Sequence, residues 1–293
     1  MKEEGSRIFK QLFLKVKDII CCPNCSGDLE LDLANNCLTC RTDPLHNFPI
    51  LKGIPSFVKR EEISPEDAEW VSEYDEKAGE YDERIGKEAE RMGIDFKEEL
   101  SRILERVPVK PSCRILDVST GTGALIFGIG EVFPDVSCEF VGVDLSISML
   151  RVAQGKFTRA KMEVPLFHSQ VMKLPFKDGS FDIVTHFGGI NTFRDIPTAL
   201  KEWVRVLKSE GYLLVVDEGV SPALRKTRKG ANLIKGNWLF GLQPPLEYLP
   251  PQVKKVELGW VMKDMFYAMS CQKLSQEELT ELQPLRIWLT AST

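Results

Sequence analysis

Five of the eight cysteines lie within residues 21–40, and four of these five form two C-x-x-C pairs. Cys22 and Cys25 make the first pair, Cys37 and Cys40 make the second, and 11 residues separate the pairs. Two tight turns that each present two thiolates give the tetrahedral sulfur set that zinc prefers. The spacing therefore predicts a structural zinc site. Because four protein ligands leave no open coordination position, we expect the metal to stabilise a small module and not to take part in a reaction.

Other assignments of the cysteines stay open at this point. Two disulfides, or a module that has lost its metal, are alternatives to zinc. Cys21 and His46 lie beside the two pairs as substitute ligands. Cys113, Cys138 and Cys271 are scattered through strand-like segments and are most simply reduced thiols of the core.

A glycine loop, DVSTGTG, runs from Asp117 to Gly123, and an acid, Asp144, follows about twenty residues later. A dinucleotide site would need a third glycine where this chain has Ile126, and the Asp117 carboxylate would repel a pyrophosphate. A ligand with a positive charge and no phosphate fits better, and S-adenosylmethionine is such a ligand. Asp144 can accept hydrogen bonds from both ribose hydroxyls, while Gly121 and Gly123 allow close approach of the backbone.

The elements that position this loop are strands alternating with helices from residue 113 onward. The strand-like runs are CRILDVS, EFVGVDL, FDIVTHF and GYLLVVDE. This alternation is typical of a doubly wound α/β fold with a mostly parallel sheet. Ligands of such sheets bind beyond the carboxyl ends of the strands. We therefore expect the glycine loop and Asp144 at one edge of the sheet.

Four further segments, in this order, accompany the glycine loop: WVSEYDEKAGEYDE (70–83), LPFKDGSFDIV (174–184), KEWVRVLKSEGYLLVVDE (201–218) and VKKVELGWVMKDMFYAMSCQKL (253–274). Together they resemble the class I S-adenosylmethionine-dependent methyltransferases of the group that contains the ubiquinone and menaquinone C-methyltransferases. The resemblance covers about residues 70–274. It implies a Rossmann-like fold with a seven-stranded, mostly parallel sheet that ends in an antiparallel hairpin.

The resemblance also implies which residues contact the cofactor: Tyr81, Asp117, Ser119, Gly121, Gly123, Asp144, Leu145, Gln170, Val171 and His186. Two of these depart from the family pattern. Ser119 replaces the first glycine after the acid of the loop, and Gln170 replaces the acid that receives the adenine amino group. A glutamine amide can still accept from that amino group, so we expect weaker or altered binding and not its loss.

The segment after the second cysteine pair carries a second resemblance. Its FPI-x-x-GIP run resembles the zinc-ribbon module of the small activator subunit of tRNA and rRNA methyltransferases, over about residues 20–58. A different zinc module opens the rRNA guanine-N1 methyltransferases and uses a histidine ligand close after the third cysteine. This chain has a second C-x-x-C there, which disfavours the rRNA interpretation.

Methyl transfer needs in-line approach and exclusion of water but no fixed catalytic triad. His186, at the end of the FDIVTHF run, is our hypothesis for a base or an acceptor contact, because its ordinary pKa is near neutral. Residues 225–235 hold five basic side chains and no acid, and Trp238, Phe240 and Tyr248 follow. This insertion predicts a pocket for an apolar or anionic acceptor. A solvated helix face and an RNA-binding patch are the alternatives.

Composition excludes several classes of protein. With 293 residues, 43% of them hydrophobic, the chain can bury a large core, so wholesale disorder is excluded. The net charge of −5 argues against a generally basic nucleic-acid binder. Residues 61–105 alone hold 17 acidic and 6 basic residues. No apolar run reaches the ~18 residues of a membrane span, and the N-terminus lacks the features of a signal peptide, so we expect a cytoplasmic protein.

The sequence predicts four parts: a helix and zinc ribbon (1–60), an acidic helical lid (61–112), a methyltransferase core (113–274, with an insertion at 219–252) and a helical tail (275–293). The predicted function is methyl transfer to a small-molecule acceptor, with S-adenosylmethionine and zinc as cofactors. Two alternatives stay open: an rRNA or tRNA methyltransferase that recognises RNA through the ribbon, and a non-catalytic adaptor with a degenerate cofactor fold.

Overall fold

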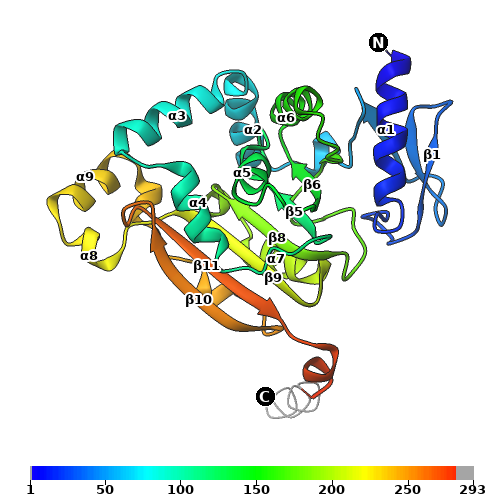
Figure 1. Cartoon of the computed structure of the whole chain (residues 1–293). Helices are drawn as coiled ribbons and strands as arrows, with labels where there is room; N and C mark the ends of the chain where they lie inside the picture. The colour runs from blue at the N-terminus through cyan, green and yellow to red at the C-terminus, as the bar shows by residue number, and fades with distance from the viewer. Residues whose placement is uncertain (1, 282–293) are drawn as a thin grey trace.

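The N-terminal part consists of one helix and a small antiparallel sheet, which lie side by side at one end of the molecule (Figure 1). The structure is a computed structural model and describes residues 2–281, so most of the predicted tail lies outside the described residues. The small sheet has the strand order β1-β2-β3-β4. The bounds are α1 (Lys2–Val16), β1 (Leu29–Asp32), β2 (Cys37–Cys40), β3 (Asn47–Leu51) and β4 (Ile54–Pro55).

The core is a seven-stranded sheet with the order β10-β11-β9-β8-β5-β6-β7. The strands from β9 to β7 pair in parallel, whereas β11 pairs antiparallel with both β9 and β10. This is the predicted doubly wound Rossmann-like fold, which is confirmed. The bounds are β5 (Arg114–Val118), β6 (Glu139–Asp144), β7 (Leu166–His168), β8 (Phe181–Phe187), β9 (Leu207–Glu218), β10 (Val253–Val261) and β11 (Phe266–Lys273).

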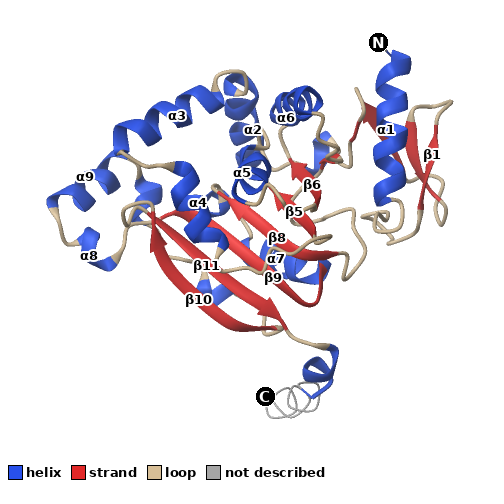
Figure 2. Cartoon of the chain, in the orientation of Figure 1, coloured by secondary structure: helices blue, strands red, loops and turns tan. Residues whose placement is uncertain are grey.

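Helices cover both faces of this sheet (Figure 2). Successive strand residues point to opposite faces, so Ile115 packs with α4 and α5, while Leu116 packs with α7 and the N-terminal part. Helix α6 joins α5 in a further cluster that includes Ile54 of the small sheet. The bounds are α4 (Phe96–Leu104), α5 (Ala124–Val132), α6 (Ile147–Ala160) and α7 (Ile196–Val206).

Two segments outside the regular alternation of strands and helices lie at the carboxyl ends of the parallel strands. The first part of the acidic segment forms η1 (Arg60–Glu62), α2 (Pro65–Lys77) and α3 (Tyr81–Met92), and neither α2 nor α3 contains a fully buried residue. The charges of these two helices therefore lie mostly on a solvated face. The insertion after β9 forms α8 (Pro222–Arg225), α9 (Arg228–Gly236), η3 (Trp238–Gly241) and η4 (Leu246–Tyr248). After β8 the chain turns through η2 (Ile190–Thr192).

The N-terminal part is packed directly onto the core. Phe9, Phe13 and Val16 of α1 are buried in the same hydrophobic cluster as Leu116 and Val184 of the sheet. A backbone bridge between Ile20 and Phe176 adds to this contact. Over residues 2–281, none of the helices combines the length and the apolar character that crossing a membrane requires.

Candidate functional site

The glycine loop after β5 folds back over the end of the sheet through residues with positive φ. Ser119, Gly121 and Gly123 have φ values of 57°, 54° and 79°. Ser119 stands where the family that the chain resembles has a glycine. A residue with a side chain adopts this positive-φ conformation at a steric cost. A Cβ atom on Gly123 would lie 2.4 Å from the Phe157 ring. Glycine at position 123 is therefore required for close packing of the loop on α6.

Asp144 ends β6 beside this loop and is held by backbone N–H groups. Its carboxylate accepts from Gly121 N at 2.7 Å and from Ser146 N at 2.8 Å. Burial raises the pKa of Asp144 to about 6, against these hydrogen bonds, which lower it. A carboxylate has about four acceptor positions, so the group keeps capacity for hydroxyl donors of a ligand.

A cleft of about 880 Å³, with its open mouth included, lies beside this loop, between the sheet and the two lid helices. Seven of the residues predicted for the cofactor line it: Tyr81, Ser119, Gly121, Asp144, Leu145, Gln170 and Val171. Four aromatic side chains in its wall were not predicted from the sequence: Trp70, Tyr74, Phe187 and Phe193. The spacing of Trp70 and Tyr74 in the sequence could have indicated this, because residues four apart lie on the same face of a helix. In the structure Trp70, Tyr74 and Tyr81 lie on one face of the lid, with neighbouring ring centroids 6.0–6.4 Å apart.

Two lid carboxylates tie the lid helices to the core. Asp75 accepts from the Ser146 hydroxyl at 2.5 Å and from Ser148 N at 3.2 Å, at the N-terminus of α6. Asp82 accepts from the Thr122 hydroxyl and from Lys156 Nζ, both at 2.5 Å. The lid is thus closed over the cleft by contacts with the two loops that form its floor.

Three residues predicted to contact the cofactor, Gly123, Asp117 and His186, are not among the residues that line the cleft. Gly123 lies behind the loop, against Phe157. Asp117 is 2% exposed and accepts from the Thr120 and Thr185 hydroxyls at 2.7 and 2.9 Å, so it braces the loop from beneath. Burial raises the pKa of this carboxyl to about 7.

His186, the third of these residues, is also the residue predicted as a base or an acceptor contact. Its ring is 1% exposed, lies on Trp203 with centroids 5.0 Å apart, and places Nδ1 3.0 Å from the Val118 carbonyl oxygen. A carbonyl only accepts, so Nδ1 carries the proton and donates. Burial lowers the pKa of His186. The ring is thus enclosed by the core in this structure and does not line the cleft.

Gln170 turns its amide nitrogen toward the lid and donates to the Glu62 carbonyl oxygen at 3.1 Å. With the amide nitrogen in this position, the amide oxygen of Gln170 can accept a hydrogen bond from a ligand. The neighbouring Val171 carbonyl accepts from Trp203 Nε1 at 3.0 Å, which fixes the wall of the cleft at this point.

A second cavity, of about 1,530 Å³ with its open mouth included, lies between α3, α9 and the ends of β8 and β9. Its wall is mostly apolar, with the side chains of Ile85, Met92, Phe96, Leu233, Phe240 and Phe266 among others. Phe187 lines both cavities and so separates them. Arg228 and Lys229 of the predicted basic stretch lie in its wall.

Glu218, at the end of β9, is an acid in this second cavity that the sequence analysis did not single out. Burial, and then a hydrogen bond with Asp217, raise the pKa of Glu218 to about 9. Asp217 itself accepts from the backbone N–H groups of Gly189, Asn191 and Glu218 at 2.8–3.1 Å. Glu218 is therefore neutral at neutral pH.

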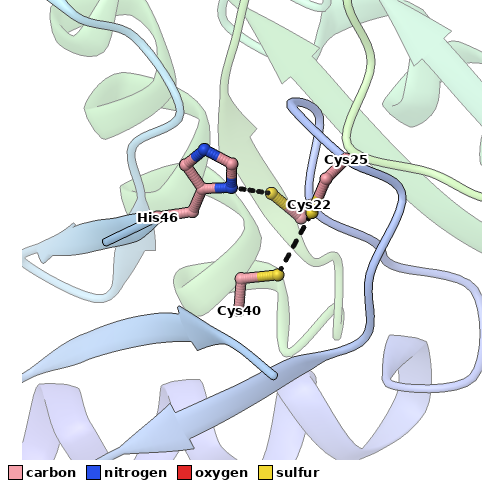
Figure 3. Close-up of side chains that lie close together, drawn as sticks. All are labelled: Cys22, Cys25, Cys40 and His46. Atoms are coloured by element: carbon pink, nitrogen blue, oxygen red, sulfur yellow. Dashed lines mark hydrogen bonds between the residues drawn. The ribbon is translucent and has the colours of Figure 1, made fainter. Parts of the chain in front are cut away.

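A separate group of potential metal ligands lies in the N-terminal part (Figure 3). The Sγ atoms of Cys22, Cys25 and Cys40 and a ring nitrogen of His46 lie within 4.8 Å of one another. Cys25 Sγ is 3.4 Å from Cys40 Sγ, and Cys22 Sγ is 3.5 Å from His46 Nδ1. Three thiolates and one imidazole are a donor set that suits tetrahedral zinc.

This donor set does not include Cys37, which the sequence predicts as a ligand. Cys37 and Cys40 lie three residues apart on β2, and an extended strand points such residues to opposite faces. Cys40 therefore faces the first pair, whereas Cys37 Sγ lies 3.6 Å from the Thr39 hydroxyl on the other side. His46, weighed as a substitute, takes the fourth position.

Comparisons with known proteins agree with this architecture. The sequence pattern of the ubiE/COQ5 methyltransferase family matches residues 94–230. The chain is 40% identical over 114 residues to a demethylmenaquinone methyltransferase of Thermus thermophilus, covering 39% of this chain and 49% of that protein. It is 30% identical over 194 residues to the protein of that name from Porphyromonas gingivalis, covering 63% of this chain and 77% of the relative.

The chain thus spans about half the length of the Thermus relative and about three quarters of the Porphyromonas one. Among solved structures, phosphoethanolamine N-methyltransferase 2 of Haemonchus contortus in complex with S-adenosyl-L-methionine is similar, with a TM-score of 0.49 and 16% sequence identity. That alignment covers 62% of this chain and 53% of the other. On the strength of the sequence relatives, the chain belongs to the ubiE/COQ5 methyltransferase family.

Proposed function

We propose that this protein is an S-adenosylmethionine-dependent methyltransferase that acts on a small apolar acceptor. The observation that carries the proposal is the pair of cavities that share Phe187 as a common wall. One is polar at its floor and suits a cofactor, and the other is apolar and suits an acceptor. Since both relatives are named demethylmenaquinone methyltransferase, we assign the acceptor to that chemical class.

S-adenosylmethionine supplies an electrophilic methyl group on a sulfonium. In the proposed site Asp144 accepts from the ribose hydroxyls, and Gly121 admits the methionine part of the ligand close to the loop backbone. Gln170 accepts from the adenine amino group through its amide oxygen. Tyr74 and Tyr81 cover the ligand from the lid and keep water out of the cleft.

The second cavity positions the acceptor in this proposal. A ring and a hydrocarbon chain of the acceptor would contact the apolar wall of this cavity and displace water. Removing apolar surface from water favours binding by roughly 25 cal/mol per Å². Arg228 and Lys229, in the wall contributed by α9, provide positive charge for a polar or anionic group.

We further propose that Cys22, Cys25, Cys40 and His46 hold a zinc ion with a structural role. Support comes from the convergence of the four donors and from Gly27, where a Cβ atom would lie 2.9 Å from Cys40 Sγ and so obstruct the turn. These four donors would fill every position of a tetrahedral ion, which would then stabilise the ribbon without taking part in methyl transfer.

Calorimetry with S-adenosylmethionine, followed by transfer of a labelled methyl group to a soluble short-chain demethylmenaquinone, tests the proposed function. We expect cofactor binding and label in the lipid-soluble product. Absence of cofactor binding would overturn the enzyme assignment in favour of an adaptor. Label in added rRNA or tRNA, with none in the quinone, would overturn the acceptor assignment in favour of RNA.

A further inference from the structure

The chain that leaves the small sheet runs along the free edge of the large one. After β4, Ser56 pairs in parallel with His168, the last residue of the edge strand β7. Phe57 N donates to the His168 carbonyl oxygen at 2.8 Å. The ring of Phe57 lies near Phe167, with ring centroids 6.2 Å apart. The N-terminal ribbon thereby extends the sheet at the strand that leads into the cofactor cleft.

The side chain of His168 joins the two parts by hydrogen bonds on both ring nitrogens. Nδ1 lies 2.8 Å from the Ser56 hydroxyl, and Nε2 lies 3.0 Å from the Leu145 carbonyl oxygen. Burial lowers the pKa of His168, so the ring is neutral and carries one proton. Because a carbonyl can only accept, that proton is on Nε2, and Nδ1 accepts from the Ser56 hydroxyl. Both polar atoms of the ring are thus satisfied only when the ribbon is in place.

The Leu145 carbonyl that His168 contacts belongs to the loop that forms the floor of the cofactor cleft. Leu145 follows Asp144, and both residues line the cleft. Asp144 pairs in register with His168, and its carbonyl oxygen accepts from Ser169 N at 3.1 Å. A change in the position of the imidazole therefore acts on the backbone of the residue next to the proposed ribose-binding carboxylate.

We propose that His168 is a positioning residue through which the ribbon holds the 144–146 loop in the conformation that binds the cofactor. The inference rests on the proposed function for the identity of the ligand, but it assigns the ribbon a part in cofactor affinity beyond stability. Neither Ser56 nor His168 lines the cleft, so both act through Leu145 and not by contact with the ligand.

The decisive variant is Ser56→Ala, which removes one hydroxyl and leaves Nδ1 of a buried ring without a donor. We expect its dissociation constant for S-adenosylmethionine to rise about five-fold, the ordinary effect of losing one neutral hydrogen bond. Ser56→Thr retains the hydroxyl and should restore affinity. His168→Phe, which keeps a ring but removes both hydrogen bonds, should weaken binding further, while the KM for the acceptor stays constant in all three.

The matched control is Asp28→Asn, which breaks another contact between ribbon and core. Asp28 pairs with Lys177 Nζ at 2.7 Å, away from the cleft. It should leave cofactor affinity unchanged even if it lowers the melting temperature. The inference is overturned if Ser56→Ala binds the cofactor like wild type, or if Asp28→Asn weakens binding equally. A wild-type protein that binds no S-adenosylmethionine would instead contradict the proposed function itself.

Discussion

Asp144 contacts the cofactor most directly in the proposed site, and its charge is essential to that role. Asp144→Asn should raise the dissociation constant for S-adenosylmethionine roughly 10- to 100-fold, since hydrogen bonds to a charged group contribute about 1.5–3 kcal/mol. Calorimetry measures the loss, and Asp135→Asn, an exposed acid outside the cleft, is the control. Equal affinity of wild type and Asp144→Asn would remove Asp144 from the site.

The pH dependence of cofactor binding follows from the same carboxyl. Burial raises the pKa of Asp144 to about 6, so the group is charged above pH 6 and gains a proton below it. A protonated carboxyl loses attraction for a cationic ligand, so affinity should fall as the pH drops through 6. Titration calorimetry between pH 5 and pH 8 checks this. An Asp144→Asn variant should bind with little pH dependence over the same range.

Glu218 belongs to the second cavity, where its neutral carboxyl can donate to an oxygen of the acceptor. Asp217 and Tyr267 face it from the sheet, Glu88 from α3, and Arg228 with Lys229 from α9. The pKa of Glu218 is raised to about 9, so the donor is present at neutral pH and is lost as the pH rises through 9.

The acceptor KM of the wild type should therefore rise above pH 9, whereas that of Glu218→Gln should stay flat. Glutamine keeps a neutral donor, and Glu218→Leu, which has none, should raise the acceptor KM about five- to ten-fold at pH 7. Steady-state kinetics with constant cofactor measures both effects. A Glu218→Leu enzyme with an unchanged acceptor KM would exclude this hydrogen bond.

At the scale of single elements, the pleat of strand β2 decides which cysteine faces the group of potential metal ligands. Because Cys37 and Cys40 point to opposite faces, Cys37→Ser should retain about one zinc per chain. His46→Ala and Cys22→Ser each remove a donor and should lose most of it. Metal analysis of the purified variants by mass spectrometry gives the stoichiometry. Loss of zinc from Cys37→Ser with retention in His46→Ala would restore the four-cysteine site.

The limits of sequence-based prediction are visible in the same elements. The parallel sheet could be predicted because each strand is a local apolar run and the order of motifs is specific. The two cysteines of a C-x-x-C face one another when the segment is a turn. The second C-x-x-C instead forms strand β2, and the pleat of this strand is set by its pairing with β1 and β3. The spacing alone could not distinguish these geometries.

The same reasoning explains why some residues predicted for the cofactor site do not line the cleft. His186 and Asp117 lie at the correct strand ends, so sequence position favoured them, but which side chain faces the cleft depends on neighbours from other elements. Trp203 covers His186, and Thr185 binds Asp117. Glu218 was overlooked because an acid at the end of a strand carries no local signal, although the carboxyl end of a parallel strand is where ligands bind.

At the scale of the whole molecule, neither the charges nor the hydrophobic packing follow the boundaries of the predicted parts. The acidic segment 61–105 has a solvated face, yet Asp75 and Asp82 turn inward and close the lid over a site for a cationic cofactor. The predicted parts 1–60 and 113–274 share one hydrophobic cluster, in which Phe48 and Phe57 of the ribbon join Phe167 and Phe176 of the core. The ribbon and core are therefore expected to unfold together.

Removal of the metal should accordingly destabilise the whole protein and not the ribbon alone. A structural metal stabilises the native state by its binding free energy, and a loss of about 4 kcal/mol corresponds to roughly 10 °C in melting temperature for a chain of this size. Scanning calorimetry with and without a chelator should show one transition that moves to lower temperature. The Cys22→Ser variant, which lacks a donor, should not respond to the chelator. Two separate transitions, with only the smaller one moved by chelation, would mean that the shared cluster does not couple ribbon and core.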